Sequence, residues 1–203
     1  MYQLGEYNRR KDLTEQGTEI RDLVLTNPDY DTLKSKIEEI NILEEESIII
    51  LKRAILAGYS TSYYGFGWAK EMEIEFWELV NSKAPNSGVS ILTLADSYRA
   101  HNAKTLKEVA QMYMSAIEIN SEHYYLIMSE DFDLFRKDDE LKFKFTDIEL
   151  EVLEEQWGIE EFKEELPYIK QQCDGDEELV QYKTQKIAEI IKRKAANIKP
   201  TSG

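Results

Sequence analysis

The stretch from Ala57 to Val80 constrains the fold more than any other part of this sequence. It holds two of the three tryptophans, Trp68 and Trp77, among several other aromatic rings. The spacing predicts a tight turn at Gly58 and then a helix to about Ser82 that is apolar on most sides. Because other elements must cover such a helix, we expect it at the centre of a bundle, with both tryptophans buried.

The composition also favours helices. The chain has only 9 glycines and 4 prolines in 203 residues, whereas Glu, Lys, Leu and Ile are abundant. This length is sufficient for a substantial hydrophobic core. We therefore predict an all-α antiparallel multi-helix bundle with a buried aromatic central hairpin. Residues 1–130 would form the helical core, and residues 131–203 an acidic segment and a C-terminal amphipathic helix packed on the same domain.

The apolar spacing predicts long helices on both sides of the aromatic stretch. From Leu33 the apolar residues recur in steps of three to five, which predicts one helix over residues 31–57, capped by Asp29 or Asp31. A similar pattern predicts one helix over residues 91–119. The alternation from Leu141 to Phe145 is a short strand-like signal. Further helices are predicted over residues 8–25, over 146–165 with an interruption near Gly158, and over 177–199.

The net charge of −15 is distributed unevenly. Residues 130–178 hold 19 acidic and 6 basic residues, a net charge of −13, whereas residues 179–203 carry a net charge of +5. The field of the acidic segment should repel nucleic acid and attract basic proteins. One interpretation is a solvated surface. The other is a non-enzymatic binding protein, such as an immunity protein or inhibitor, that neutralises a basic protein partner.

Cysteine use and hydropathy indicate the compartment. Cys173 is the only cysteine, so no intrachain disulfide can form and a reducing compartment fits. The N-terminal residues lack the apolar core of a signal peptide. The longest strongly aliphatic run, Ile48–Leu51, is far shorter than the ~20 residues that span a bilayer. We expect a cytoplasmic protein that has no membrane contact.

Several familiar kinds of site are absent from the sequence. It contains no glycine-rich phosphate-binding motif and no GxSxG elbow. One cysteine and two histidines exclude a classical zinc site. Neither His101 nor His123 has a glutamate three residues before it, as di-iron helix bundles require. We therefore expect no metal and no cofactor.

Arg99 and His101 are the best catalytic candidates. A histidine can act as general acid or base near neutral pH, and an arginine can hold a phosphate. Together they could cleave RNA without metal, with the 2′-hydroxyl as nucleophile. Asn102 and Lys104 would support them. On a continuous helix a one-residue spacing turns the two side chains ~200° apart, so they would converge only across a dimer interface or in a distorted helix. The alternative is a structural role for His101.

Glu71 and Glu75 are further supporting candidates, because residues four apart share a helix face. As a buried carboxylate pair they could orient a cation. The alternative is a solvated stripe.

Three short motifs carry a family resemblance. They are Ala57-Gly58-Tyr59, Trp68-Ala69-Lys70-Glu71 and Arg99-Ala100-His101-Asn102-Ala103-Lys104. Over about residues 44–114 the chain resembles the HEPN superfamily, and within it the AbiV-type abortive-infection proteins. The resemblance implies a helical homodimer and a metal-independent ribonuclease of anti-phage defence, with Arg99 and His101 at the dimer seam. It also implies RNA as substrate and a phage component as the activating protein partner.

Overall fold

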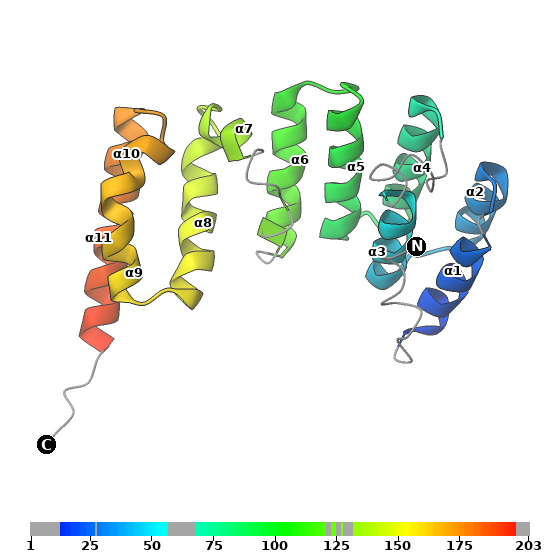
Figure 1. Ribbon diagram of the computed structural model, residues 1–203, viewed down its shortest axis with the longest axis horizontal. Coiled ribbons are helices and arrows are strands. Elements are labelled where there is room, and N and C mark those ends of the chain that lie inside the picture. The colour runs from blue at the N-terminus through cyan, green and yellow to red at the C-terminus, as the bar shows by residue number, and fades with distance from the viewer. Residues whose placement is uncertain are drawn as a thin grey trace, which may run out of the picture. The chain divides into compact units, whose positions relative to one another are not determined.

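The computed structural model describes residues 13–26, 28–56, 68–120, 123–124, 127 and 132–197. Every regular element in these ranges is a helix, which confirms the predicted all-α multi-helix fold (Figure 1). The chain divides into two compact units, residues 1–119 and 120–203, and each is described by itself. The predicted turn at Gly58 lies outside the described residues.

The first unit is built from helices that pack in antiparallel pairs. Helix α5 packs against α3, α4 and α6, while α1 packs against α3 and α2 against α4. Short turns at residues 84–87 and 101–105 make α4, α5 and α6 consecutive antiparallel neighbours (Figure 1). The helices described here are α1 (Glu15–Leu25), α2 (Tyr30–Glu39), α3 (Glu45–Leu56), α4 (Lys70–Lys83), α5 (Gly88–Ala100) and α6 (Leu106–Ile119).

Helix α5, rather than the aromatic helix α4, is the most enclosed helix of this unit. Nine of the thirteen residues of α5 are buried, compared with four of the fourteen residues of α4. The expectation that the aromatic helix is apolar on most sides is therefore wrong. Small residues such as Ser90, Ala95 and Ser97 let neighbouring helices approach α5 closely, whereas α4 exposes Glu71, Glu75 and other charges.

The aromatic side chains of α4 nevertheless form a buried cluster, in which Trp77 is buried as predicted and Trp68, just before α4, is half-buried. Trp77 is 1% exposed and Phe76 is fully buried. The Phe76 ring lies 4.9 Å from the half-buried Trp68 ring, which in turn meets the Tyr30 ring edge-on at 5.0 Å. These contacts fix α2 against α4.

The helix predicted over residues 31–57 is interrupted. Helix α2 ends at Glu39, and Ile40 is extended before α3 begins at Glu45. Hydrogen bonds to residues of α1 and α4 hold this turn. Leu43 N–H donates to the Lys83 carbonyl. The Gln16 side chain accepts from Glu44 N–H and donates to the Ile42 carbonyl. The near-helical spacing of apolar residues continues across this break because Leu43, in the turn, is also buried. The spacing therefore predicted one continuous helix.

The helix predicted over residues 91–119 is also interrupted. Asn102 adopts a left-handed conformation with φ of 51°, and Ala103 N–H bonds the Tyr98 carbonyl, as in a Schellman helix end. Helix α6 then starts from a capping box, in which Thr105 Oγ1 accepts from Glu108 N–H and the Glu108 carboxylate accepts from Thr105 N–H. His101 therefore lies in a turn rather than inside a helix.

The second unit consists of helices that gather around α11. Helix α11 packs against α8, α9 and α10, and α7 packs against α8. Their bounds are α7 (Phe132–Arg136), α8 (Lys142–Gln156), α9 (Ile159–Glu165), the 3₁₀ turn η4 (Leu166–Tyr168), α10 (Ile169–Gln172) and α11 (Glu177–Asn197).

Two sequence expectations for this unit have different outcomes. The interruption near Gly158 is confirmed, because Gly158 separates α8 from α9 and its N–H bonds the Glu161 carboxylate. The strand-like signal from Leu141 to Phe145 is too short to predict a strand, and residues 142–145 begin α8. Phe145 stacks on Phe135 of α7, with ring centroids 4.3 Å apart. The burial of Phe145 against Phe135 stabilises the start of α8, although the alternating apolar residues are also compatible with a strand.

The core of the second unit encloses a charged pair. Phe162, Ile169, Cys173, Ile187 and neighbouring apolar residues form the core. Beside them, Lys183 of α11 is 3% exposed, and its Nζ lies 2.8 Å from Glu149 Oε2 of α8 and 3.0 Å from Gln172 Oε1. Buried charges require such partners, so this pair fixes α11 against α8.

Candidate functional site at the turn between α5 and α6

The centre of the candidate site is a hydrogen bond between His101 and Glu73. His101 Nε2 lies 3.0 Å from Glu73 Oε2, and their side chains are 17% and 6% exposed. Glu73 belongs to the first turn of α4, while His101 follows the last residue of α5. The antiparallel pairing of α4 and α5 brings the two together at one end of the first unit.

This contact determines the tautomer of the neutral imidazole. A carboxylate only accepts hydrogen bonds, so Nε2 carries the ring proton that Glu73 accepts. The lone pair of the neutral ring is then on Nδ1, which can accept a proton. A buried carboxylate that orients a histidine in this way is a common feature of histidines that bind metals or transfer protons.

Arg99 is the residue before the last residue of α5 and has a neighbour on α6. Burial and the Asp96 carboxylate raise the pKa of Tyr113, while the positive charge of Arg99 acts in the opposite direction. Tyr113 donates to Asp96 at 2.7 Å, and Lys52 of α3 contacts the other Asp96 oxygen at 2.9 Å. Thus His101 is held on the α4 side of α5, whereas Arg99 joins a polar cluster with Asp96, Tyr113 and Lys52.

The turn itself places Asn102 and Lys104. Asn102 supplies the left-handed residue that ends α5. Lys104 Nζ lies 4.9 Å from the centre of the Tyr98 ring and 3.6 Å from a Glu108 oxygen. Burial, followed by the hydrogen bond to Glu78, raises the pKa of Tyr98 to about 12. Tyr98 therefore stays neutral and protonated beneath the Lys104 ammonium.

Glu71 and Glu75 do not form a buried carboxylate pair, which corrects that sequence-based interpretation. Both residues are exposed. Glu75 pairs with Lys34 of α2, and this contact holds the pKa of the Glu75 carboxyl below its usual range. Glu73, between them, is the carboxylate that reaches His101. The turn signals at Asn102 and Thr105–Glu108 could have shown that α5 ends near His101, but not that His101 meets Glu73.

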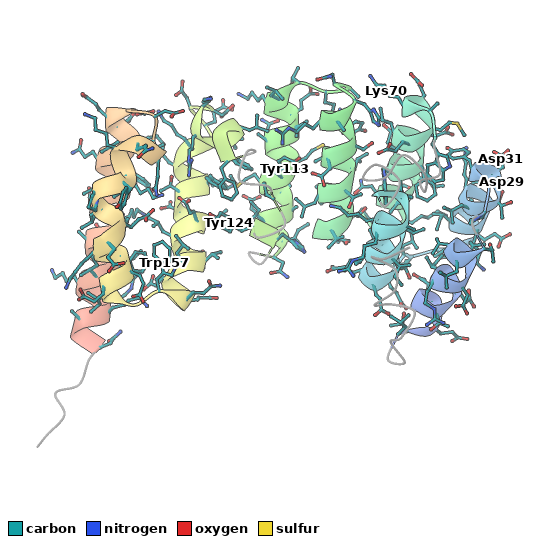
Figure 2. The ribbon with its side chains drawn as sticks, in the orientation of Figure 1. Asp29, Asp31, Lys70, Tyr113, Tyr124 and Trp157 are labelled. Atoms are coloured by element: carbon teal, nitrogen blue, oxygen red, sulfur yellow. The ribbon has the colours of Figure 1, made fainter. Side chains whose placement is uncertain are left out.

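Residues 96–108, around this turn, hold three basic and two acidic residues, so the acidic excess of the chain does not extend to this turn. Arg99, Lys104 and Lys107 lie within nine residues of one another along the chain. Lys70 begins α4 one turn before Glu73 (Figure 2). Phosphate groups bind where Lys and Arg cluster, so the local charge at this turn suits an anion better than the net charge indicates.

Comparisons with protein-family models, curated proteins and solved structures find no match to this chain. Within the described part of the chain, no group of three His, Cys, Asp or Glu side chains is arranged to hold a metal ion. None of the described helices is both long enough and apolar enough to cross a bilayer.

Proposed function

We propose that the chain is a HEPN-like anti-phage protein that cleaves RNA without metal at the turn between α5 and α6. The observation that carries the proposal is the 3.0 Å contact between His101 and the buried Glu73 carboxylate. It leaves one imidazole nitrogen as a base, with Arg99 two residues earlier at the end of α5. The proposal further includes a homodimer and activation by a phage component.

In the proposed reaction, His101 Nδ1 takes the proton of an RNA 2′-hydroxyl. The 2′-oxygen then bonds to the adjacent phosphorus, and the bond from phosphorus to the 5′-oxygen breaks. The leaving oxygen takes a proton from water, which gives a 2′,3′-cyclic phosphate and a 5′-hydroxyl. Arg99 and Lys104 would balance the negative charge of the phosphate, and Glu73 would hold the imidazole that becomes positive.

The direct test compares RNA cleavage by the full chain with cleavage by His101→Ala and Arg99→Ala, in EDTA, with and without extract of phage-infected cells. General-base catalysis contributes about 10²–10⁴-fold, so His101→Ala should lose at least 100-fold. His123→Ala, in the second unit, is the matched control and should keep full activity. Equal cleavage by the wild type and His101→Ala would remove His101 from the site.

The acidic segment supports a second candidate, a binding protein for a basic protein partner. Glu151, Glu155, Glu160, Glu164 and Glu177 are all exposed. A suitable test neutralises Glu151, Glu155 and Glu164, because Glu154 pairs with Arg193 and Glu161 caps α9. Binding to a basic partner should weaken in this variant and fall steeply as salt rises. If neither the substitutions nor added salt weakens binding, the acidic surface is not the binding site.

A further inference from the structure

Arg99 and His101, the two groups that the proposed reaction needs, contact different neighbours of α5. His101 Nε2 lies 3.0 Å from Glu73 Oε2 of α4. Arg99 precedes His101 by two residues, a step that turns two helical side chains ~200° apart. It shares a helix face with Asp96, three residues earlier, and Asp96 contacts Tyr113 of α6. The Arg99 guanidinium is therefore directed away from the imidazole that would act as base.

Contacts from three helices meet at the Asp96 carboxylate. Tyr113 OH donates to Asp96 Oδ1 at 2.7 Å, and Lys52 Nζ of α3 lies 2.9 Å from Asp96 Oδ2. Tyr113 is 1% exposed, so packing fixes the position of its hydroxyl. Burial and then Asp96 raise the pKa of Tyr113, whereas the charge and a hydrogen bond of Arg99 lower it. Arg99 therefore lies against the Tyr113 oxygen, beside Asp96.

This contact holds Arg99 weakly, because the charge of Asp96 is already balanced. Lys52 forms an ion pair with Asp96, and the two side chains are 23% and 42% exposed, so water also screens the carboxylate. The Tyr113 oxygen that Arg99 contacts is neutral. A hydrogen bond of this kind shifts an equilibrium by roughly two- to tenfold. A modest external influence is therefore enough to free the guanidinium.

We propose that Tyr113 and Asp96 hold Arg99 in a resting position, and that release of Arg99 from α6 makes it available to a phosphate at His101. The inference rests on the proposed ribonuclease function and names the contact that regulates its site. In the resting state only His101 faces the phosphate. In the released state the long Arg99 side chain turns around the end of α5 and adds its positive charge there. The activating component would act by separating Arg99 from Tyr113.

Lys52 has the opposite effect to Tyr113 in this scheme. Its ammonium competes with the Arg99 guanidinium for the Asp96 carboxylate, because both cations lie beside the same anion. Without Lys52, Asp96 would attract Arg99 more strongly. Removal of the Tyr113 hydroxyl and removal of Lys52 should therefore change the site in opposite directions, whereas purely structural roles would impair it in both variants.

The test measures how tightly the full chain binds a short fluorescent 2′-O-methyl RNA, which lacks the nucleophilic hydroxyl, by anisotropy at low salt. Tyr113→Phe keeps the buried ring and releases Arg99, so it should bind about fivefold more tightly. Lys52→Met should bind about threefold more weakly. If Tyr113→Phe does not fold, Asp96→Asn removes the holding charge instead and should also bind more tightly.

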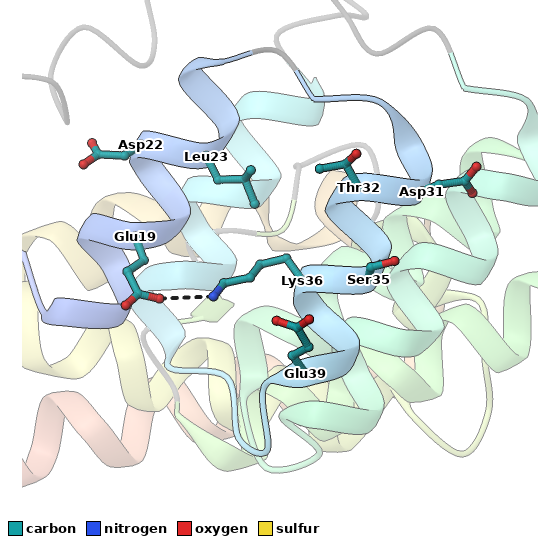
Figure 3. Close-up of a pocket in the computed structure, with 8 residues that line it drawn as sticks. All are labelled: Glu19, Asp22, Leu23, Asp31, Thr32, Ser35, Lys36 and Glu39. Atoms are coloured by element: carbon teal, nitrogen blue, oxygen red, sulfur yellow. Dashed lines mark ion pairs between the residues drawn. The ribbon is translucent and has the colours of Figure 1, made fainter.

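Two matched control variants remove the same kinds of group elsewhere. Tyr182→Phe acts on a second Lys–Asp–Tyr group, in which Tyr182 OH and Lys186 Nζ each lie 2.9 Å from Asp147. Lys36→Met breaks the pair that Lys36 Nζ makes with Glu19 Oε2 at 3.4 Å between α2 and α1 (Figure 3). Both controls should change affinity by less than about twofold. If Lys36→Met weakens binding as much as Lys52→Met, the loss is a general charge effect and the role of Lys52 is rejected.

Nitrogen NMR of the guanidinium gives a readout that needs no RNA. The Arg99 Nε signal, assigned by its loss in Arg99→Lys, should differ from the signals of exposed arginines in the wild type. In Tyr113→Phe it should move towards them. An Arg99 signal that is the same in both proteins would overturn the proposal, as would equal binding of the 2′-O-methyl RNA by both.

Cleavage of ordinary RNA separates this proposal from the function on which it rests. Without phage extract, Tyr113→Phe should cleave about fivefold faster than the wild type. If Tyr113→Phe binds more tightly and its Arg99 signal moves, but no protein cleaves RNA, the resting contact is supported and the ribonuclease function is contradicted. If the wild type cleaves RNA and Tyr113→Phe neither binds nor cleaves better, the function stands and the resting contact is rejected.

Discussion

Lys183 and Glu149 form an ion pair within the core of the second unit, with Nζ and Oε2 2.8 Å apart and both residues less than 9% exposed. Tyr124 OH also donates to Glu149, at 3.3 Å, and Gln172 bonds the ammonium. Each charge is buried only because the other balances it. Removing Lys183 therefore leaves the buried Glu149 carboxylate with only Tyr124 and the more distant Arg136, at 3.7 Å, and removing Glu149 leaves the buried ammonium with Gln172.

We expect Lys183→Met to lower the free energy of unfolding by roughly 3–5 kcal/mol. The double variant Glu149→Met/Lys183→Met should lose less than the sum of the two single changes, because it leaves no isolated charge. Urea unfolding, followed by circular dichroism, of the wild type, the two single variants and the double variant gives the four free energies of unfolding that this double-mutant cycle compares. Strictly additive losses would contradict the pairing of these two groups.

The left-handed residue in the turn between α5 and α6 gives a second prediction. Asn102 has φ of 51°, a conformation that glycine adopts without a steric cost. Asn102→Gly should leave the thermal midpoint almost unchanged, whereas Asn102→Ala should cost about 1 kcal/mol. Lys107→Ala, on the exposed side of α6, serves as a comparison. If alanine is tolerated as well as glycine, the turn does not have this geometry.

The tautomer of His101 can be measured without any substrate. Nitrogen NMR of the neutral imidazole should show the proton on Nε2 because Glu73 accepts it. Glu73→Ala removes that acceptor and should shift the His101 ring towards a mixture of tautomers. The signals of His123, which lies in the second unit, should not move. A proton on Nδ1 in the wild type would rule out the proposed base.

The start of α11 predicts a pH-dependent contribution to stability. The Leu179 N–H and then the Lys142 ammonium lower the pKa of the Asp176 carboxyl. A lowered folded-state pKa stabilises the protein above the unfolded value of ~3.9 and loses this effect as pH falls through the folded value.

Asp176→Asn should therefore be less stable than the wild type at pH 6, and the difference should shrink below about pH 4. Unfolding midpoints measured from pH 6 to pH 2.5 check this. Asp29→Asn, at the cap of α2, should show the same trend in the first unit, because the pKa of Asp29 is also lowered. A difference that grows towards low pH would contradict the assignment.

Local signals in the sequence were enough to predict the helical class, the burial of Trp77 and the break at Gly158. Two other breaks were missed for a common reason. Apolar periodicity continues across a short turn when a turn residue such as Leu43 is itself buried. The capping pair Thr105–Glu108 was visible in the sequence, but the pattern around it was still assigned to one helix.

The polar contacts of the site could not be predicted from periodicity. Glu71, Glu73 and Glu75 differ in the sequence only by position, and their roles depend on which helix each one faces. Glu75 reaches Lys34 of α2, and Glu73 reaches His101 after α5. These partners are 41 and 28 residues away along the chain, beyond the range of any local pattern.

The position of Lys183 in the first third of α11 has a consequence for shortened forms of the chain. Deletions from the C-terminal end first remove the Arg193–Glu154 pair and then the core residues Ile190 and Ile187, so stability should already fall before Lys183 is reached. A deletion that passes Lys183 takes away the only ammonium that Glu149 contacts within the described residues. At that point α8 retains a buried carboxylate with only Arg136 and Tyr124 nearby, and the second unit should fail abruptly.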